Sequence, residues 1–407
     1  AKYCSSYSTL FMTIRVKVLS NNAMPLLKAF RRSISGIGGK RLTIVALSCW
    51  TSILLLLYNS LERSQIAGVV AIDRTFAVSP EGAPPVIGTY AVFSSVEVVY
   101  ALPTEKTKLS GIALLFHGCS HNALKFFSPT NTHCKRCVGL SEELRISRIL
   151  LEQGYAVLAI SSQDRTNGCW NSKQDTPRVR TALAEFRNLI APQQVESEVG
   201  IVLAIGASSG GHFAAEVAVV NLSDAALVMV MNLGPLLTDR LIAIGRDNSK
   251  NDVARLPPIY LAPMPRDTRT TAAAKKDYAA IMAADIQGDV PLVLDTTTCV
   301  PFAVTVEFLN ERVPLMRKDA AELIVKSLIK AGHLDAASRN LLKDPTRSNW
   351  RDVLRDECGD ACLQRQPLEK GHSPLAKALH RAWAFHEYCS EVILIALDFF
   401  EKKLTRM

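Results

Sequence analysis

The chain has 407 residues, and 48% of them are hydrophobic, which is enough for one large domain or two modest ones with a packed core. Its formal net charge is +9, yet residues 1–61 contain eight Lys or Arg and no Asp or Glu. The remainder carries 39 basic and 38 acidic residues. A body so close to neutral lacks the basic face that phosphate binding requires, so no nucleic-acid partner is expected.

The positive charge precedes an uncharged stretch, LTIVALSCWTSILLLLYNSL, over residues 42–61. As a helix rising about 1.5 Å per residue it would extend roughly 30 Å, the thickness of a bilayer core. We expect residues 1–41 to be a basic cytosolic segment, residues 42–61 a single transmembrane helix, and the rest to be lumenal or extracellular. A cleaved signal, an organelle-targeting segment and a buried helix are the alternatives.

A linker over residues 62–88, rich in Pro and Gly at its end, leads into the body of the chain, residues 89–407. There, short apolar runs alternate with amphipathic stretches, which predicts an α/β fold with a mainly parallel sheet flanked by helices. The expected strands are 90–100, 111–118, 155–161, 200–206, 226–234, 258–264 and 291–296. The expected helices are 141–154, 177–190 and 211–220, a helical insertion over 316–380 that forms part of a cap, and one closing helix over 380–404.

The stretch LAIGASSGGHF, residues 203–213, places a Gly-x-Ser-x-Gly pattern between a predicted strand and a predicted helix. The pattern alone often arises by chance, but this context is that of a nucleophile elbow. The sharp turn would hold Ser208 in a strained conformation beside a helix N-terminus, where Gly206 and Gly210 avoid clashes. Ser209 is the weaker nucleophile candidate, and a Gly/Ser-rich turn without chemistry is the alternative.

A nucleophilic serine needs a base and an acid that orients the base. Asp267 follows the predicted strand 258–264, at the carboxyl end where sites on parallel sheets gather, so we expect it to be the acid. His386 lies just before the last apolar stretch and is expected to be the base. The rival acids are Asp239 and Asp295, and the rival histidines are His333, His372 and His380.

A His-Gly turn ends the predicted strand 111–118 in the stretch LLFHGCSH. Turns of this kind supply a backbone N–H to an oxyanion hole. We therefore expect the hole at Gly118, with the backbone amides of Cys119, or its neighbour, and Ser209 as donors.

Eight of the ten cysteines lie beyond the apolar span, and an even number there is typical of disulfides in an oxidising compartment. Cys134-x-x-Cys137 has three interpretations: a disulfide that staples a loop, two plain thiols, or zinc or redox chemistry. We favour the disulfide, because neither a second tight pair for zinc nor a thioredoxin-like setting is evident. The same ranking applies to Cys358 and Cys362, and no metal site is expected.

Over residues 85–405 the order of these features resembles that of the α/β-hydrolases. The segments HGCSH, CKRCVGLSEE, GASSGG, AGHLD, LLKDPTRSNW and HEYCSE are similar, more narrowly, to a little-characterised group of plant and algal α/β-hydrolase-like proteins with an N-terminal membrane segment. The resemblance implies the α/β-hydrolase fold and hydrolase chemistry but no substrate. Pro-Arg-Asp stands where Gly-x-x-Asp is more usual before the acid.

We therefore expect a serine hydrolase of the carboxylesterase or lipase type that cleaves an ester, or less favourably an amide. Ser208 would attack, His386 would move the proton, and Asp267 would orient His386. The expected partners are a small-molecule ester or lipid-like substrate and the membrane, and no cofactor is expected. The alternatives are a catalytically silent α/β-hydrolase fold that binds a ligand or partner, and a thiol oxidoreductase.

Overall fold

The computed structural model describes residues 85–104, 109–130, 132–191, 200–246, 257–285, 294–359, 368 and 371–405. The basic segment 1–41, the expected transmembrane helix 42–61 and almost all of the linker 62–88 lie outside the described residues, so these assignments stay predictions. Among the helices that the structure describes, none combines the length and apolar character that a membrane crossing requires.

Eight strands form one sheet in the order β1-β2-β4-β3-β5-β6-β7-β8. The strands are β1 Thr89–Phe93, β2 Val96–Ala101, β3 Gly111–Phe116, β4 Tyr155–Ile160, β5 Ile201–Ala207, β6 Ala225–Met229, β7 Ile259–Ala262 and β8 Leu294–Thr296. β2 pairs antiparallel with β1 and β4, and all other pairs are parallel. The single strand predicted over 90–100 is a hairpin, because Ser94 and Ser95 adopt φ values of 43° and 70° and reverse the chain.

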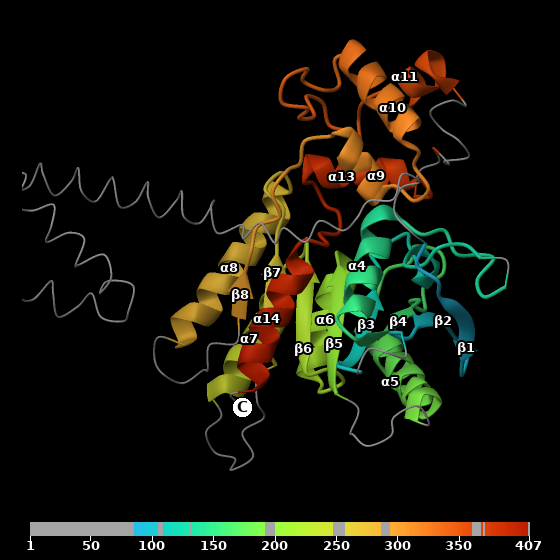
Figure 1. Cartoon of the computed structure of the whole chain (residues 1–407). Helices are drawn as coiled ribbons and strands as arrows, with labels where there is room; N and C mark the ends of the chain where they lie inside the picture. The colour runs from blue at the N-terminus through green and yellow to red at the C-terminus, as the bar shows by residue number, and fades with distance from the viewer. Residues whose placement is uncertain are drawn as a thin grey trace, which may run out of the picture. The chain divides into compact units, whose positions relative to one another are not determined.

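Helices cover both faces of the sheet (Figure 1). Residues of α4 (Ser141–Glu152) and α14 (Val392–Leu404) share one hydrophobic cluster with the sheet. A second cluster, on the other face, contains residues of α5 (Ser172–Ile190), α6 (Ser209–Val219), α7 (Pro235–Arg246) and α8 (Thr268–Asp285). With both faces covered, the central strands are apolar throughout, as in the β3 sequence GIALLF. This topology is that of the α/β-hydrolase fold, so the predicted fold class is confirmed.

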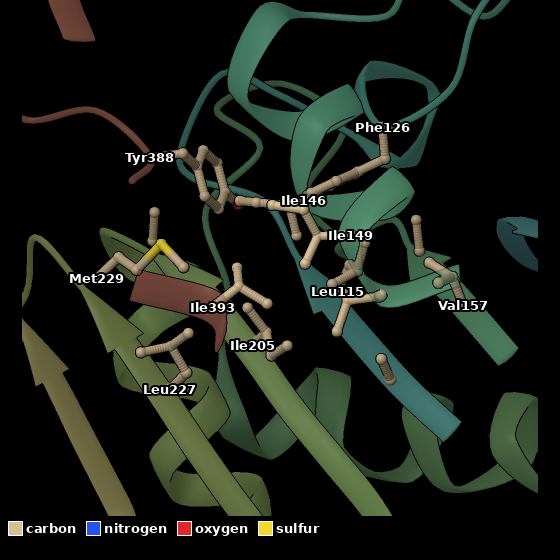
Figure 2. Packing of buried hydrophobic residues seen from close by; sticks show 14 of the residues in the cluster. Leu115, Phe126, Ile146, Ile149, Val157, Ile205, Leu227, Met229, Tyr388 and Ile393 are labelled. Atoms are coloured by element: carbon tan, nitrogen blue, oxygen red, sulfur yellow. The ribbon is translucent and has the colours of Figure 1, made fainter. Parts of the chain in front are cut away.

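The first cluster holds the sheet beneath α4 and α14 (Figure 2). Leu115, Ile205 and Leu227 come from three neighbouring strands, and Ile146 and Ile393 come from the two helices that pack on them. All five side chains are at most 1% exposed. This packing fixes where α14 begins, and therefore where the segment before it lies.

A separate group of helices contains α9 (Val306–Arg312), α10 (Lys318–Lys330), α11 (Trp350–Glu357) and α13 (Pro374–Trp383). These helices share their own hydrophobic cluster, which includes Leu309, Ile324 and Trp350. Figure 1 shows the group beyond the end of the sheet at which α14 begins. The role of the insertion as a cap stays a prediction.

The prediction of one closing helix over residues 380–404 is wrong. The chain is non-helical over residues 384–391, between α13 and α14. Ala384 and His386 have φ values of 53° and 44°, in the left-handed region that a right-handed helix cannot accommodate. The break turns residues 384–391 into a loop, called the histidine loop below.

Candidate active site

Ser208 lies on the sharp turn between β5 and α6. Its φ is 55° and its ψ is −128°, a conformation that non-glycine residues rarely adopt and that costs about 1–3 kcal/mol. A Cβ atom on Gly206 would lie 2.2 Å from the Gly210 carbonyl oxygen, and one on Gly210 would lie 2.1 Å from that of Phe116. The turn therefore has no room for side chains at these two positions, and it presents Ser208 at the N-terminus of α6.

Three side chains that are distant in the sequence meet at this turn. The His386 Nε2 lies 2.9 Å from the Ser208 Oγ, and the His386 Nδ1 lies 2.6 Å from the Asp267 Oδ2. If the Nδ1 hydrogen is donated to the carboxylate, Nε2 is left as an acceptor for the serine hydroxyl. Asp267 is buried, whereas the His386 side chain is 39% exposed, so solvent reaches the imidazole more readily than the carboxylate.

The rival histidines lie in other surroundings. The His372 Nδ1 is 3.2 Å from the Lys125 Nζ, and the His380 Nδ1 is 3.8 Å from a carboxylate oxygen of Glu387. His333 is buried, and burial lowers its pKa below the ordinary value. The structure therefore brings His386, and not these three histidines, to Ser208.

The rival acids and the second serine are also placed apart from the imidazole. Asp239 is exposed on α7, and Asp295 is exposed in β8, where its Oδ1 accepts a hydrogen bond from the next backbone amide. The Ser209 Oγ lies 3.3 Å from the Cys119 Sγ. Ser208 is thus the serine of the pair whose hydroxyl contacts His386.

The His117-Gly118 turn, at the end of β3, lies against the elbow. A Cβ atom on Gly118 would be 3.5 Å from the Ser208 Cβ. The His117 ring is fully buried, and this burial lowers its pKa to about 4, so the ring is neutral at pH 7. Its Nε2 accepts the Ser162 backbone N–H at 3.1 Å, which leaves Nδ1 to donate to the Gly118 carbonyl oxygen at 2.8 Å. The carbonyl and N–H of a trans peptide point in opposite directions, so this bond turns the Cys119 N–H away from His117.

Two backbone amides next to Ser208 are available to an oxyanion. Within the described part of the chain, neither the Cys119 N–H nor the Ser209 N–H donates to another group. Ser209 is also the first residue of α6, whose N-terminus favours negative charge. The residues expected at the oxyanion hole therefore gather around the serine.

The histidine loop is anchored on both sides of His386. The Tyr388 hydroxyl donates to the Phe116 carbonyl oxygen at 2.8 Å, at the end of β3. Cys389 forms a disulfide with Cys299. Cys299 in turn follows β8, and its N–H donates to the carbonyl oxygen of Pro263, beside the end of β7. These contacts tie the loop to two strand ends of the sheet.

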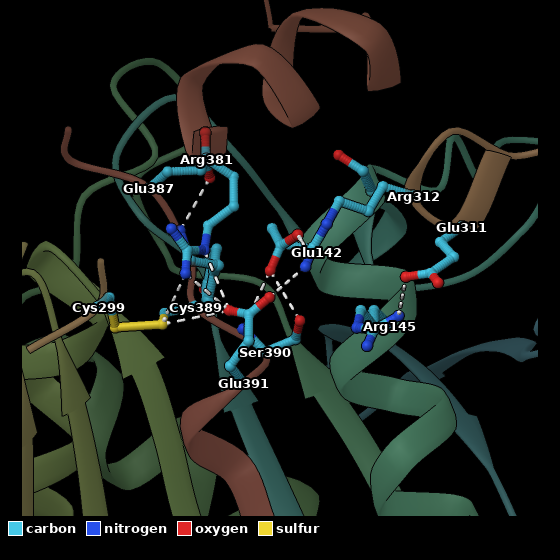
Figure 3. A network of polar contacts seen from close by, with 12 residues as sticks. Glu142, Arg145, Cys299, Glu311, Arg312, Arg381, Glu387, Cys389, Ser390 and Glu391 are labelled. Carbon is cyan, nitrogen blue, oxygen red and sulfur yellow. Dashed lines mark hydrogen bonds and ion pairs between the residues drawn. A yellow bond between two sulfur atoms is a disulfide. The ribbon is translucent and has the colours of Figure 1, made fainter. Parts of the chain in front are cut away.

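Buried ion pairs hold the end of this loop (Figure 3). Glu142 accepts from both the Ser390 N–H and its hydroxyl, at 3.0 and 2.8 Å, and pairs with Arg312. Glu391 pairs with Arg312 and with Arg381, the latter at 2.9 Å. Burial alone would lower the pKa of Arg312, but the two carboxylates more than offset this and raise it. Sequence reasoning missed these residues, because nothing local in α4 or α9 points to His386.

Arg266 was also missed, although it stands directly before Asp267. Its N–H donates to the Ala384 carbonyl oxygen at 3.3 Å, and its guanidinium donates to that of Trp383 at 3.1 Å. The guanidinium carbon lies 3.3 Å from the centre of the Trp383 ring, in a cation–π contact. Arg266 therefore links the loop that carries Asp267 to the loop that carries His386.

A second buried group of charges lies beside Glu387 in the histidine loop. Burial, followed by repulsion from Glu387, raises the pKa of Glu143 to about 8. Its carboxyl lies 3.6 Å from the His121 Nδ1. Burial opposes ionisation of Glu387 too, but Lys377 at 2.9 Å outweighs it and holds the pKa of Glu387 well below its usual range. Because the pKa of Glu143 lies above 7, its carboxyl is mostly protonated at neutral pH.

Glu143→Gln is expected to flatten the pH dependence of stability between about pH 5 and 8. The folded protein keeps the Glu143 proton up to about pH 8, whereas the unfolded chain loses it near the ordinary glutamate value of 4.5. The stabilisation is complete below the unfolded pKa and is lost as the pH rises through the folded pKa, at up to about 1.4 kcal/mol per pH unit. Urea unfolding of both proteins at several pH values measures this. Parallel pH profiles would contradict the assignment.

The cysteines of the described residues are in disulfides. Cys119 pairs with Cys169, and Cys134 pairs with Cys137. Cys358 is disulfide-bonded as well. Cys134 and Cys137 are only 2% and 4% exposed, which favours the interpretation of a staple over that of a redox pair. In the part of the chain that the structure describes, no group of His, Cys, Asp or Glu is arranged to hold a metal ion.

No protein-family model matches the chain, and no curated protein sequence matches it. Distant likenesses are found among solved structures. The chain is 14% identical to an acylaminoacyl peptidase of Pyrococcus horikoshii, over 53% of this chain and 37% of the peptidase, with a TM-score of 0.34. For an esterase of Pyrococcus furiosus the identity is 11%, the coverage 53% and 87%, and the TM-score 0.32. For a Xanthomonas campestris α/β serine hydrolase without a lid, the values are 11%, 54% and 87%, and 0.30.

Proposed function

We propose that the protein is a serine hydrolase that cleaves a carboxylic ester through an acyl-enzyme intermediate. The observation that carries the proposal is the continuous contact from Asp267 through His386 to Ser208, at 2.6 and 2.9 Å, on an elbow beside two amides that have no partner among the described residues. A nucleophile within reach of a base, and a base held by a third group, is the arrangement that activated serines require.

In this mechanism the Ser208 oxygen attacks the ester carbonyl carbon while His386 Nε2 takes the hydroxyl proton. Asp267 holds the ring and stabilises the imidazolium that forms. The oxyanion receives hydrogen bonds from the Cys119 and Ser209 amides, and its collapse expels an alcohol that takes the proton from His386. Water then attacks the acyl-enzyme with His386 again as base, which releases the acid and restores Ser208.

The strained backbone favours this proposal over a silent binding protein. Both Ser208 and His386 have positive φ, and each such conformation costs about 1–3 kcal/mol. The glycines of the elbow, the Arg266 link and the anchored histidine loop together maintain one relative placement of the two side chains. Hydrolysis requires the hydroxyl to be held against the imidazole, whereas binding of a ligand does not.

A fluorophosphonate probe is expected to form one covalent adduct with the wild-type protein, at Ser208. The probe reacts with a serine only where a base removes its proton and amides bind the phosphoryl oxygen. Peptide mapping by mass spectrometry locates the adduct, and Ser208→Ala and Ser209→Ala are the paired variants. Labelling that survives in Ser208→Ala, or that is absent from folded wild-type protein, would remove the basis of the proposal. A panel of esters of increasing acyl length then defines the substrate class.

A further inference from the structure

The loop over residues 162–170, between β4 and α5, contacts the turn over residues 117–121 at both of its ends. Each of the following contacts joins this loop to that turn: the disulfide Cys119–Cys169, Ser120 N to Asn167 O at 2.6 Å, Trp170 Nε1 to His117 O at 2.8 Å, and Ser162 N to His117 Nε2 at 3.1 Å. Three of these contacts are hydrogen bonds, and the fourth is covalent. The disulfide is made by Cys119, the residue whose N–H faces the proposed oxyanion.

The loop is itself held by internal hydrogen bonds. The Asp164 Oδ1 accepts the backbone N–H groups of Thr166 and Asn167, both at 2.9 Å, and its carbonyl oxygen accepts that of Gly168 at 3.0 Å. Gly168 has a φ of 64°, and a Cβ atom there would lie 2.9 Å from the His121 carbonyl oxygen. The loop therefore packs directly against the backbone of the turn, and its own backbone is tied by these hydrogen bonds.

Hydrogen bonds hold the peptide groups on both sides of the Cys119 Cα: the Gly118 carbonyl oxygen accepts the His121 N–H at 3.3 Å, and the Ser120 N–H donates to Asn167. His117 holds the carbonyl of Gly118, but the Cys119 N–H has no partner within the described residues, and its direction follows the backbone around it. The disulfide to Cys169 adds a covalent contact through the Cys119 side chain, which restricts the movement of the Cys119 Cα further. An oxyanion donor has to be held at about 2.7–3.1 Å from the developing charge, so small rotations of this peptide weaken it.

We propose that Cys169 is a positioning residue for acyl transfer: its disulfide to Cys119 holds the Cys119 amide in the oxyanion hole. The inference rests on the proposed hydrolase function and adds a requirement for one particular disulfide. Cys119 and Cys169 are both partly exposed, whereas Cys134, Cys137, Cys299 and Cys389 are at most 4% exposed. Among the described disulfides, Cys119–Cys169 is therefore the one that a dithiol in solution reaches most readily.

Cys169→Ser is expected to lower kcat for ester hydrolysis at least about tenfold while KM stays within about twofold. Removal of a whole oxyanion donor costs about 10²–10³ in kcat, and here the donor is loosened rather than removed. The pH profile of kcat should keep the wild-type midpoint, because His386 and Asp267 are untouched. The matched control is the double variant Cys134→Ser, Cys137→Ser, which removes a disulfide of sequence separation 3 and should keep the wild-type kcat.

A dithiol provides the same test without a substitution. It reduces the Cys119–Cys169 bond to two thiols and is itself oxidised to a cyclic disulfide, so two electrons and two hydrogens pass to the protein. Brief treatment with dithiothreitol should lower kcat of the wild type and of the control variant by the same factor, and reoxidation should restore it. Peptide mapping after alkylation of a parallel sample shows which disulfide has been reduced. If Cys169→Ser does not fold, the dithiol experiment tests the role of the disulfide by itself.

An unchanged kcat in folded Cys169→Ser, or in protein with the bond shown to be reduced, would overturn the inference. A rise in KM with an unchanged kcat would overturn it as well, because the disulfide would then affect substrate binding and not acyl transfer. A loss of kcat in the control variant equal to that in Cys169→Ser would also do so, because it would indicate a general structural role of disulfides. Wild-type protein without any turnover that depends on Ser208 would instead contradict the proposed function. The two failures are therefore distinguishable.

Discussion

Ser208→Ala is expected to lower kcat for ester hydrolysis by about a millionfold, the loss seen when the nucleophile of a serine hydrolase is removed. The variant keeps the elbow, the histidine and the oxyanion amides, but no oxygen remains to form the acyl-enzyme. Stability should change little, because alanine meets the same backbone strain at φ 55° and the lost hydroxyl is partly exposed. Steady-state kinetics with a chromogenic ester measures the effect, with a melting curve to verify folding.

Ser209→Ala is the matched control for this prediction. It removes a hydroxyl from the neighbouring residue, leaves the Ser209 backbone amide in place, and should keep kcat within about tenfold of the wild type. A large loss in Ser209→Ala together with a small one in Ser208→Ala would make Ser209 the nucleophile. Equal turnover in all three proteins would indicate that hydrolysis occurs elsewhere.

His386→Ala is expected to lower kcat by a similar factor, since serine and histidine act as one unit and removal of either costs about as much as removal of both. The double variant with Ser208→Ala should therefore be no slower than either single variant. His386 is partly exposed and lies on a loop anchored by its neighbours, so the fold should survive. The measurement is kcat of the two single variants and the double variant under identical conditions.

His372→Ala and His380→Ala are the controls for the choice of base. His372 contacts Lys125 and His380 lies near Glu387, and neither contacts Ser208. Each should keep kcat within about tenfold of the wild type. If His372→Ala or His380→Ala lost turnover and His386→Ala kept it, the assignment of His386 as the base would be wrong, and with it that of Asp267 as the acid that orients the base.

The strand–turn–helix around Ser208 was predictable because its signal is local. A buried strand, two glycines and a helix occupy consecutive positions around Ser208, and steric exclusion at Gly206 and Gly210 is a property of that turn alone. Asp267 was predicted from a general property of parallel sheets, namely that functional sites lie at the carboxyl ends of the strands. The structure places its carboxylate 2.6 Å from the imidazole of His386.

The histidine loop could not be predicted in the same way. Residues 380–404 have the composition of a helix, and no proline or glycine marks the break. The break depends on long-range contacts that hold residues 384–391 in an irregular path, such as those of Glu142 with Ser390 and of Cys299 with Cys389. Tertiary contacts override local helix preference here. The pairing of Cys119 with Cys169, 50 residues apart, was hidden for the same reason.

The position of His386 in the chain has a consequence for biosynthesis. All eight strands and the elbow precede it, and Cys389 has to find a partner made 90 residues earlier. As the chain leaves the ribosome, the eight strands and Ser208 are therefore made before His386, the base of the proposed mechanism. On the proposed mechanism, such a nascent protein carries an inert hydroxyl, and it acquires activity only once the segment with His386 has docked beside Ser208.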